Sequence, residues 1–287
     1  MKEKKYNFLM VQPFRIQKDS EYLTWTVEGT REERLMNYHN LNLGPLLEDV
    51  EWEIHPGPLA PYGNWPVENR EEFALVAAAR LAIVKEACAS GKHDAIILLG
   101  GGEPGVFECK EIGKRYGVPV TSCAWAQMHV ACLLGNKFSV IDLSESHSMY
   151  YYNLVVQHHM TQRCASIRNI NYPLGRPTGE NKRSLPDEKE KALRGEYSQG
   201  VEDAVAAAVK AIEEDGAEVI TFGCSGTYWL KSFVQDRLQK MGWDVPVLEG
   251  YSCAITMAKL MVDLGIDASG LWLPADVTKN YRAKKVF

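Results

Sequence analysis

The sequence lacks the features that mark several large classes of protein. Its formal net charge is −5, so it has no basic excess of the kind that binds nucleic-acid phosphates. No run approaches the roughly 18 apolar residues that a membrane helix needs. The apolar run Phe8 to Val11 is too short for the core of a secretory signal peptide. We therefore expect a cytoplasmic protein with no nucleic-acid partner and no membrane partner.

Disulfide and metal-binding patterns are missing as well. The seven cysteines are an odd number, which does not fit a framework of disulfide pairs in a chain without secretion signals. No CxxC or HxxxH pair is present, so the usual spacing of structural zinc ligands has no counterpart. We expect no metal ion and no other cofactor, and we expect most of the cysteines to be buried apolar residues.

Short apolar runs alternate with amphipathic stretches along the chain. The apolar runs predict strands at residues 7–11, 94–99, 118–122, 138–141 and 219–222. The stretches with helical spacing predict helices at residues 71–90, 127–134 and 201–214. Continuous apolar strands that alternate with helices are typical of parallel sheets covered on both faces. The sequence therefore predicts an α/β fold.

Two segments of the chain repeat one pattern. The first runs from Asp94 to about Trp125, and the second runs from Glu218 to about Ser252. Each consists of a strand, a glycine-containing loop, a helix, the strand motif Val-Pro-Val and a second helix. The duplication predicts two similar parallel-sheet domains of the flavodoxin-like type, related by pseudo-symmetry and facing each other across a cleft. We assign residues 1–123 and 248–287 to the first domain and residues 124–247 to the second.

A polar insertion interrupts the second domain at about residues 175–194. Lys, Glu, Arg, Pro and Gly dominate it, and it has few apolar residues. This composition predicts a solvated loop with a short polar helix. The alternative is a lid over the cleft or a contact between subunits.

Cys224 is the residue in the predicted cleft best suited to chemistry. Ligands of open parallel sheets bind beyond the carboxyl ends of the strands, and Cys224 follows such a strand. Its thiol would lie near free backbone N–H groups at the positive end of the next helix, which favours the thiolate. A thiol/thiolate couple can move a proton at a carbon beside a carbonyl, and Ser225 and Gly226 could supply donors to the resulting oxyanion. The alternative is a cysteine that is merely buried at a strand end.

The segments around these loops resemble hydantoin racemases of the aspartate/glutamate/hydantoin racemase superfamily. Gly223-Cys-Ser-Gly226, followed by Val245 to Gly250, is similar to their second cysteine region. Leu99 to Val106 is similar to their first cysteine loop, and the resemblance runs from about Phe8 to about Gly265. It implies a cofactor-independent enzyme that works in a cleft between two domains. The racemases of this superfamily use two cysteines on opposite faces of a substrate carbon.

The chain departs from this pattern at the first cysteine, whose position is held by Gly100. The two-base mechanism cannot run in its ordinary form without that thiol. The arylmalonate decarboxylases of the same superfamily resemble this chain in having glycine at the first position and cysteine at the second. A lyase with Cys224 as its sole proton donor is therefore an alternative to a racemase.

Several other residues fall at positions that the resemblance places near the substrate. Glu103 and Cys123 are candidates for a second base, with a loop-capping carboxylate and a buried thiol as the respective alternatives. Trp125 stands where the family usually has Glu, Asp142 where Thr is common, and Gln12 where the family has Asn. The changes at Trp125 and Asp142 indicate a substrate unlike a simple amino acid. Gly101 and Gly102 could add backbone N–H donors to the pocket.

Our functional hypothesis is proton transfer at an acidic carbon next to a carbonyl of a small hydantoin-like or carboxylate substrate, with Cys224 as the acid/base. One alternative is a one-cysteine lyase such as a decarboxylase. Another is an enzyme in which Cys224 attacks a ring carbon of the substrate. A third is a non-catalytic binding protein for a small molecule. We also expect a homo-oligomer.

Overall fold

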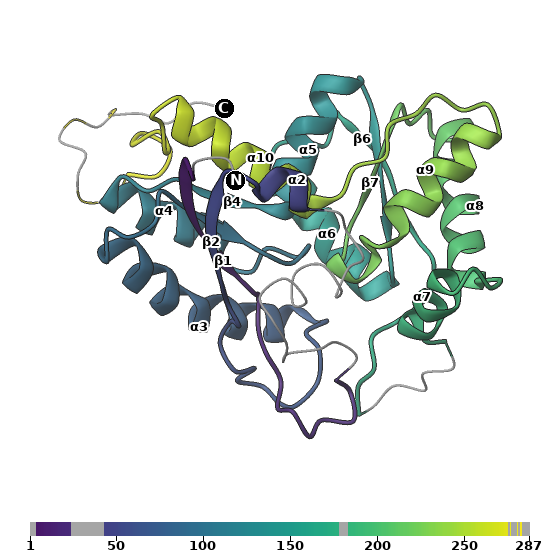
Figure 1. The fold of residues 1–287 in the computed structure, drawn as a ribbon, viewed down its shortest axis with the longest axis horizontal. Helices are drawn as coiled ribbons and strands as arrows, with labels where there is room; N and C mark the ends of the chain where they lie inside the picture. Colours follow the sequence, from purple (N-terminus) through teal and green to yellow (C-terminus); the bar gives the residue numbers. More distant parts are fainter. Residues whose placement is uncertain are drawn as a thin grey trace.

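The computed structural model describes residues 4–23, 43–177, 183–274, 276, 280 and 282. Its strands form two parallel sheets, one with the order β2-β1-β3-β4 and one with the order β6-β5-β7 (Figure 1). The strands are β1 Tyr6–Val11, β2 Val50–His55, β3 Ala95–Leu98, β4 Val120–Ser122, β5 Phe138–Asp142, β6 Cys164–Asn169 and β7 Val219–Phe222. The α/β class and the parallel sheets predicted from the sequence are confirmed.

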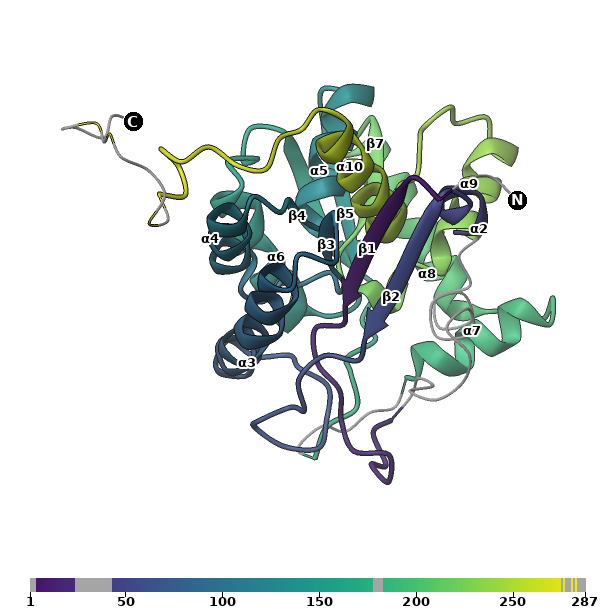
Figure 2. The ribbon, with the colours of Figure 1, turned by 60° about the vertical axis from the view of Figure 1, so that its left-hand side comes forward.

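Helices cover the sheets and join them. The helices are α2 Gly44–Leu47, α3 Arg70–Ala89, α4 Val106–Tyr116, α5 Cys123–Leu134, α6 Glu145–Gln157, α7 Leu185–Leu193, α8 Gln199–Glu213, α9 Leu230–Lys240 and α10 Gly250–Asp263. Helix α10 packs against α5 and against β3 and β4. Figures 1 and 2 show α5 and α10 side by side between the two sheets. In the described residues, no helix is both long enough and apolar enough to cross a membrane.

Local sequence explains where the main elements begin and end. Strands β3 and β7 consist of four buried residues each, as expected for strands covered on both faces. Helix α3 begins with a capping box in which Asn69 accepts from the N–H of Glu72 and the Glu72 carboxylate accepts from the N–H of Asn69. Helix α4 ends at Gly117, which adopts φ of +68° and so supplies the left-handed residue that closes many helices.

The structure differs from the predicted elements in three places. Strand β4 begins only at Val120, and α5 begins at once at Cys123 rather than near residue 127. The second Val-Pro-Val motif forms a single bridge, between Ile220 and Val247, instead of a strand. Pro246 has no N–H to donate, and the pairing consists of the Ile220 N–H to the Pro246 carbonyl and the Leu248 N–H to the Ile220 carbonyl, each 2.9 Å.

The two sheets are built on the same plan, as the internal repeat predicts. In the first sheet β1 lies between β2 and β3, and in the second β5 lies between β6 and β7. The bridge at Val247 stands where β4 stands in the first sheet. Strands β1–β4 fall within residues 1–123, and β5–β7 fall within residues 124–247. The exact domain boundaries stay a prediction.

Candidate active site

A cavity lies at the carboxyl ends of the central strands of both sheets. It measures about 130 Å³, whereas one buried water molecule needs about 10–15 Å³ of such space, so it has room for a small organic molecule. The residues that line it are Gln12, Pro13, Phe14, Pro66, Val67, Phe73, Gly100, Gly101, Gly102, Pro104, Leu143, His147, Leu174, Leu185, Pro186, Lys189, Cys224, Ser225, Gly226 and Trp229. The structure thus brings the predicted residues Gln12, Gly100, Gly101, Gly102, Ser225 and Gly226 together with Cys224.

Cys224 is held in place by one hydrogen bond to its side chain and one from its backbone. It follows β7 and opens a short 3₁₀ turn, Ser225–Thr227. Its Sγ accepts the backbone N–H of Gly226 at 3.4 Å, and its own backbone N–H donates to Oδ1 of Asp142 at 2.9 Å. An N–H that points at the sulfur favours a negative charge there. The thiol therefore has a fixed position in the cavity wall.

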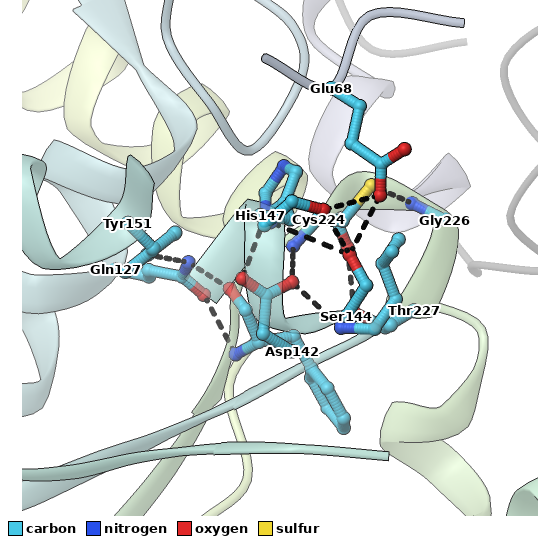
Figure 3. A network of polar contacts seen from close by, with 12 residues as sticks. Glu68, Gln127, Asp142, Ser144, His147, Tyr151, Cys224, Gly226 and Thr227 are labelled. Atoms are coloured by element: carbon cyan, nitrogen blue, oxygen red, sulfur yellow. Dashed lines mark hydrogen bonds and ion pairs between the residues drawn. The ribbon is translucent and has the colours of Figure 1, made fainter. Parts of the chain in front are cut away.

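A buried histidine and a buried aspartate lie beside this thiol (Figure 3). Nδ1 of His147 lies 2.7 Å from Oδ2 of Asp142, and the ring of His147 also hydrogen-bonds the thiol of Cys224. Because Nδ1 is engaged by Asp142, Nε2 is the ring nitrogen left for the sulfur. His147 comes from the first turn of α6, and Asp142 is the last residue of β5. Together the three residues form a Cys–His–Asp arrangement at one wall of the cavity.

The charges around His147 favour its protonated form. Burial opposes a charge on the ring, but the nearby Asp142 carboxylate and the Cys224 sulfur outweigh it and raise the pKa of His147 well above its ordinary value of 6.5. A protonated imidazole beside a thiol stabilises the thiolate. The arrangement can therefore hold a base, the thiolate, next to an acid, the imidazolium.

The opposite wall, built by the first half of the chain, has no such groups. Among the described residues that line it, no side chain titrates. Gly100 adopts φ of +97°, and a Cβ at this position would lie 2.8 Å from Cγ of Pro13. A Cβ at Gly101 would lie 1.7 Å from the carbonyl oxygen of Gly223. The loops after β3 and β7 thus meet in direct backbone contact, and the wall around Gly100 has no space for a side chain.

The structure does not bring Glu103 or Cys123 to the cavity. The Glu103 carboxylate accepts the backbone N–H of Trp125 at 2.7 Å and pairs with Nε2 of His158 at 2.9 Å. Burial raises the pKa of Glu103, but its bonds to His158 outweigh this and the net pKa is lowered. Cys123 is fully buried, and burial raises its pKa well above the ordinary value. Glu103 has the geometry of a carboxylate that caps α5, and Cys123 that of a buried thiol.

Two residues predicted to bind substrate also lie outside the cavity lining. Trp125 packs against other side chains, with Nζ of Lys110 3.3 Å from the centroid of its ring. Asp142 is fully buried beneath His147. Its contacts are with His147 and Cys224 rather than with the cavity itself.

Sequence reasoning missed His147, and it gave the contribution of the polar insertion only as an alternative. His147 follows Asp142 by five residues and starts the helix after a predicted strand, which is the signal that could have indicated it. From the insertion, Leu185, Pro186 and Lys189 line the cavity. Helix α7 therefore covers part of the site, as the lid alternative predicts. Among the described residues, no three His, Cys, Asp or Glu side chains are grouped so that they could hold a metal ion.

Comparison with known proteins identifies a family for this chain. Residues 60–258 match the family model described as Asp/Glu/hydantoin racemase. A hydantoin racemase of Paenarthrobacter aurescens is 27% identical over 203 residues, which cover 71% of this chain and 76% of that protein. The structure of an allantoin racemase from Klebsiella pneumoniae has a TM-score of 0.65 at 22% identity, with 96% of this chain and 95% of that chain covered.

A doubly substituted variant of arylmalonate decarboxylase is also similar in structure. Its TM-score is 0.54 at 11% identity, with 90% of this chain and 92% of that chain covered. These solved structures share the fold, and the match to the family model covers well over half of the chain. The chain belongs to the Asp/Glu/hydantoin racemase family.

Proposed function

We propose that this enzyme moves protons at an acidic carbon next to a carbonyl of a small hydantoin-like or carboxylate substrate, with Cys224 as the acid/base and without a cofactor. The observation that carries this proposal is the position of the Cys224 thiol. It lies in the cavity wall, held by the Gly226 N–H and hydrogen-bonded to His147. A thiolate in that setting is a suitable base for a carbon acid of this kind.

The rest of the cavity is suited to a flat, partly apolar ring. Phe14, Phe73 and Trp229 line it, and aromatic walls favour planar ligands. Removal of a proton next to a carbonyl leaves negative charge on the carbonyl oxygen, which backbone N–H groups stabilise when they are fixed in advance. Gly101, Gly102 and Ser225 are the lining residues that could supply such donors. The similarity to hydantoin racemases supports a cyclic ureide as the first substrate class to test.

The asymmetry of the cavity limits the stereochemistry of the reaction. Racemisation by two bases needs a titratable group on each face of the carbon, and the titratable side chains among the described lining residues, His147, Lys189 and Cys224, all come from the second half of the chain. Cys224 alone can exchange a proton on one face, or protonate a carbanion that loss of carbon dioxide has produced. We therefore expect a product of one handedness, or exchange with retention, rather than a racemate.

Proton NMR in deuterated water tests this proposal. Wild type and Cys224→Ser are incubated with a panel of hydantoins, amino acids and substituted malonates. Deuterium that enters one face of one substrate class, with loss of that activity in Cys224→Ser, supports the proposal. Full racemisation would show a second base and would contradict the single-face mechanism. If wild type and Cys224→Ser both bind a compound of the panel and neither converts it, the result would favour a binding protein.

A mass measurement on the same reactions separates acid/base use of Cys224 from nucleophilic use. The His147–Asp142 pair beside the thiol also resembles the arrangement that activates cysteine nucleophiles. A covalent adduct on Cys224 that forms and decays during turnover would show attack on a ring carbon. Acid/base use predicts an unmodified thiol throughout.

A further inference from the structure

We propose that His147 is a second catalytic residue, which transfers protons on the same face of the substrate as Cys224, with Asp142 as the residue that positions both. This proposal deepens the proposed function and rests on its assignment of Cys224 as the base. It assigns the enzyme to one-face proton shifts between two atoms of a substrate, an isomerisation, rather than to exchange between two faces of one carbon.

One carboxylate fixes the positions of both groups. Oδ2 of Asp142 binds Nδ1 of His147 at 2.7 Å, and Oδ1 accepts the backbone N–H of Cys224 at 2.9 Å and that of Leu143 at 2.8 Å (Figure 3). Asp142 is fully buried, so no water competes for these bonds. A Cβ at Gly223 would lie 2.3 Å from the Asp142 carboxyl carbon. Glycine at 223 is therefore what lets the carboxylate approach the backbone of Cys224.

The ring of His147 lies where it can reach a bound molecule. His147 and Cys224 both line the cavity, although they come from α6 and from the end of β7. The ring of Phe73 meets the imidazole edge-on, with the centroids 6.1 Å apart. This contact and the bond to Asp142 hold the ring at the cavity wall and leave Nε2 as the nitrogen that Asp142 does not engage.

The other charged groups near this pair do not act directly on His147. Glu68, from the loop before α3, accepts the hydroxyls of Ser144 and Ser146 at the start of α6 and pairs with Arg176 at 3.2 Å. Lys189 reaches the cavity from α7. Asp142 and Cys224 are the groups that contact His147 directly, and both favour its protonated form.

The proposed cycle needs no proton from outside. The Cys224 thiolate takes the proton from the acidic carbon, and the C–H electron pair becomes the π bond of an enolate. The His147 imidazolium then gives its Nε2 proton to a second atom of that conjugated unit on the same face. The proton now on Cys224 passes to the neutral Nε2, which restores the thiolate and the imidazolium. A racemisation would instead need a donor on the Gly100 side.

Alkylation by iodoacetamide tests the pair without a substrate. Only the thiolate reacts, so a thiol with the ordinary pKa of about 8.5 slows by roughly 50- to 100-fold between about pH 8 and pH 6. Mass spectrometry locates the label on Cys224 among the seven cysteines. We expect the alkylation of Cys224 to slow by less than about tenfold over this pH range in wild type. In His147→Gln it should slow by the roughly 50- to 100-fold of an ordinary thiol, and Asp142→Asn should lie between the two. His159→Asn, at an exposed histidine beyond the end of α6, is the matched control and should behave like wild type.

If the alkylation of Cys224 in His147→Gln depends on pH as it does in wild type, the proposal is overturned, provided that circular dichroism shows the variant to be folded. If a variant fails to fold, NMR titration of the His147 ring in wild type and Cys224→Ser answers the same question. The proposal expects the ring to lose its proton at lower pH in Cys224→Ser, and an unchanged titration would overturn it.

The catalytic role itself is tested on a substrate found in the deuterium-exchange panel. We expect His147→Gln to keep exchange at the acidic carbon but to lose delivery of the proton to the second atom. Equal loss of both would show that His147 acts only through Cys224. Failure of Cys224→Ser to lose exchange would contradict the proposed function, whereas the alkylation profile would still report on the pair.

Discussion

Gly100 and Cys224 occupy equivalent positions in the two halves of the molecule. Leu98 pairs with Val11 at the end of β1, Phe222 pairs with Ile141 one residue before the end of β5, and Gly100 and Cys224 each follow two residues later. One equivalent position carries the thiol, and the other carries a glycine with φ of +97° beneath the ring of Pro13. The candidate site is therefore chemically one-sided, although the two halves of the fold are built on the same plan.

Gly100→Cys is expected to destabilise the protein instead of creating a second base. The left-handed backbone and the 2.8 Å approach of the new Cβ to Pro13 should together lower the free energy of unfolding by about 1–3 kcal/mol. Urea unfolding measures this loss. Adding Pro13→Ala removes the contact but not the backbone strain, so the double variant should recover part of the loss. A Gly100→Cys protein as stable as wild type that racemises its substrate would contradict the expectation.

Glu103→Gln is expected to lower stability by about 3–5 kcal/mol, because it leaves the buried His158 without its carboxylate partner. The lowered pKa of Glu103 means that its contribution is present above the ordinary value of 4.5 and is lost as the pH falls through the lowered value. Thermal unfolding between about pH 3 and pH 7 should therefore show the two proteins converging at acid pH. Glu108→Gln, at an exposed position of α4, should change stability by less than about 0.5 kcal/mol. A loss of similar size in the control would show a general charge effect.

The raised pKa of His147 predicts a pH dependence of the opposite sign. The native protein holds a proton that the unfolded chain releases near the ordinary value of 6.5. The stability that this proton contributes is complete below that pH and is lost as the pH rises through the raised value. In Asp142→Asn the main cause of the shift is gone, so the fall should be weaker. Urea midpoints of the two proteins in steps above pH 6.5 give the comparison, and parallel curves would contradict it.

Lys189→Met is expected to raise KM for substrates with a carboxylate arm by about tenfold, the effect of about 1.4 kcal/mol of lost binding. Lys189 brings a cation to the cavity from α7, and burial lowers its pKa. Neutral hydantoins should keep their KM, because they have no charge for it to contact. Lys240→Met removes an exposed cation on α9 and should leave both KM values unchanged. Equal effects on charged and neutral substrates would place the role of Lys189 in the folding of α7 instead.

The predictable parts of the fold are those determined by residues that lie close together in the sequence. Strand β7 is a run of four residues before Gly223, three of them apolar, and α3 carries its own capping box, so both are readable locally. The second Val-Pro-Val motif was misleading because the same letters lead into a strand in one half and form a single bridge in the other. What differs is the pairing with the neighbouring strand, which covers three residue pairs beside β3 and one beside β7, and a local pattern does not contain it.

The candidate site likewise has residues that the sequence predicts and residues that it does not. The glycine loop and Cys224 were predictable, because parallel sheets place the carboxyl ends of their strands at one edge. His147 was not, because its importance comes from contacts with Asp142 and with Cys224, which lies 77 positions further along the chain. Glu103, in contrast, was a sequence candidate for a second base but does not line the cavity. It stands beside the glycine loop in sequence, but a φ of +50° accompanies the turn of its side chain toward the N-terminus of α5.

The hydrogen bonds of Asp142 link Cys224 and His147 within one half of the molecule, whereas the cavity lies between the two halves. The backbone of Cys224 and the imidazole of His147 are bonded to one carboxylate within the second half of the chain, whereas Gln12 and the glycine loop belong to the first. If the two halves move apart to admit a substrate, the sulfur and Nε2 travel together as one rigid unit. Closure then changes the position of the substrate and of Phe73 relative to them, while the bonds of Asp142 keep the two groups side by side.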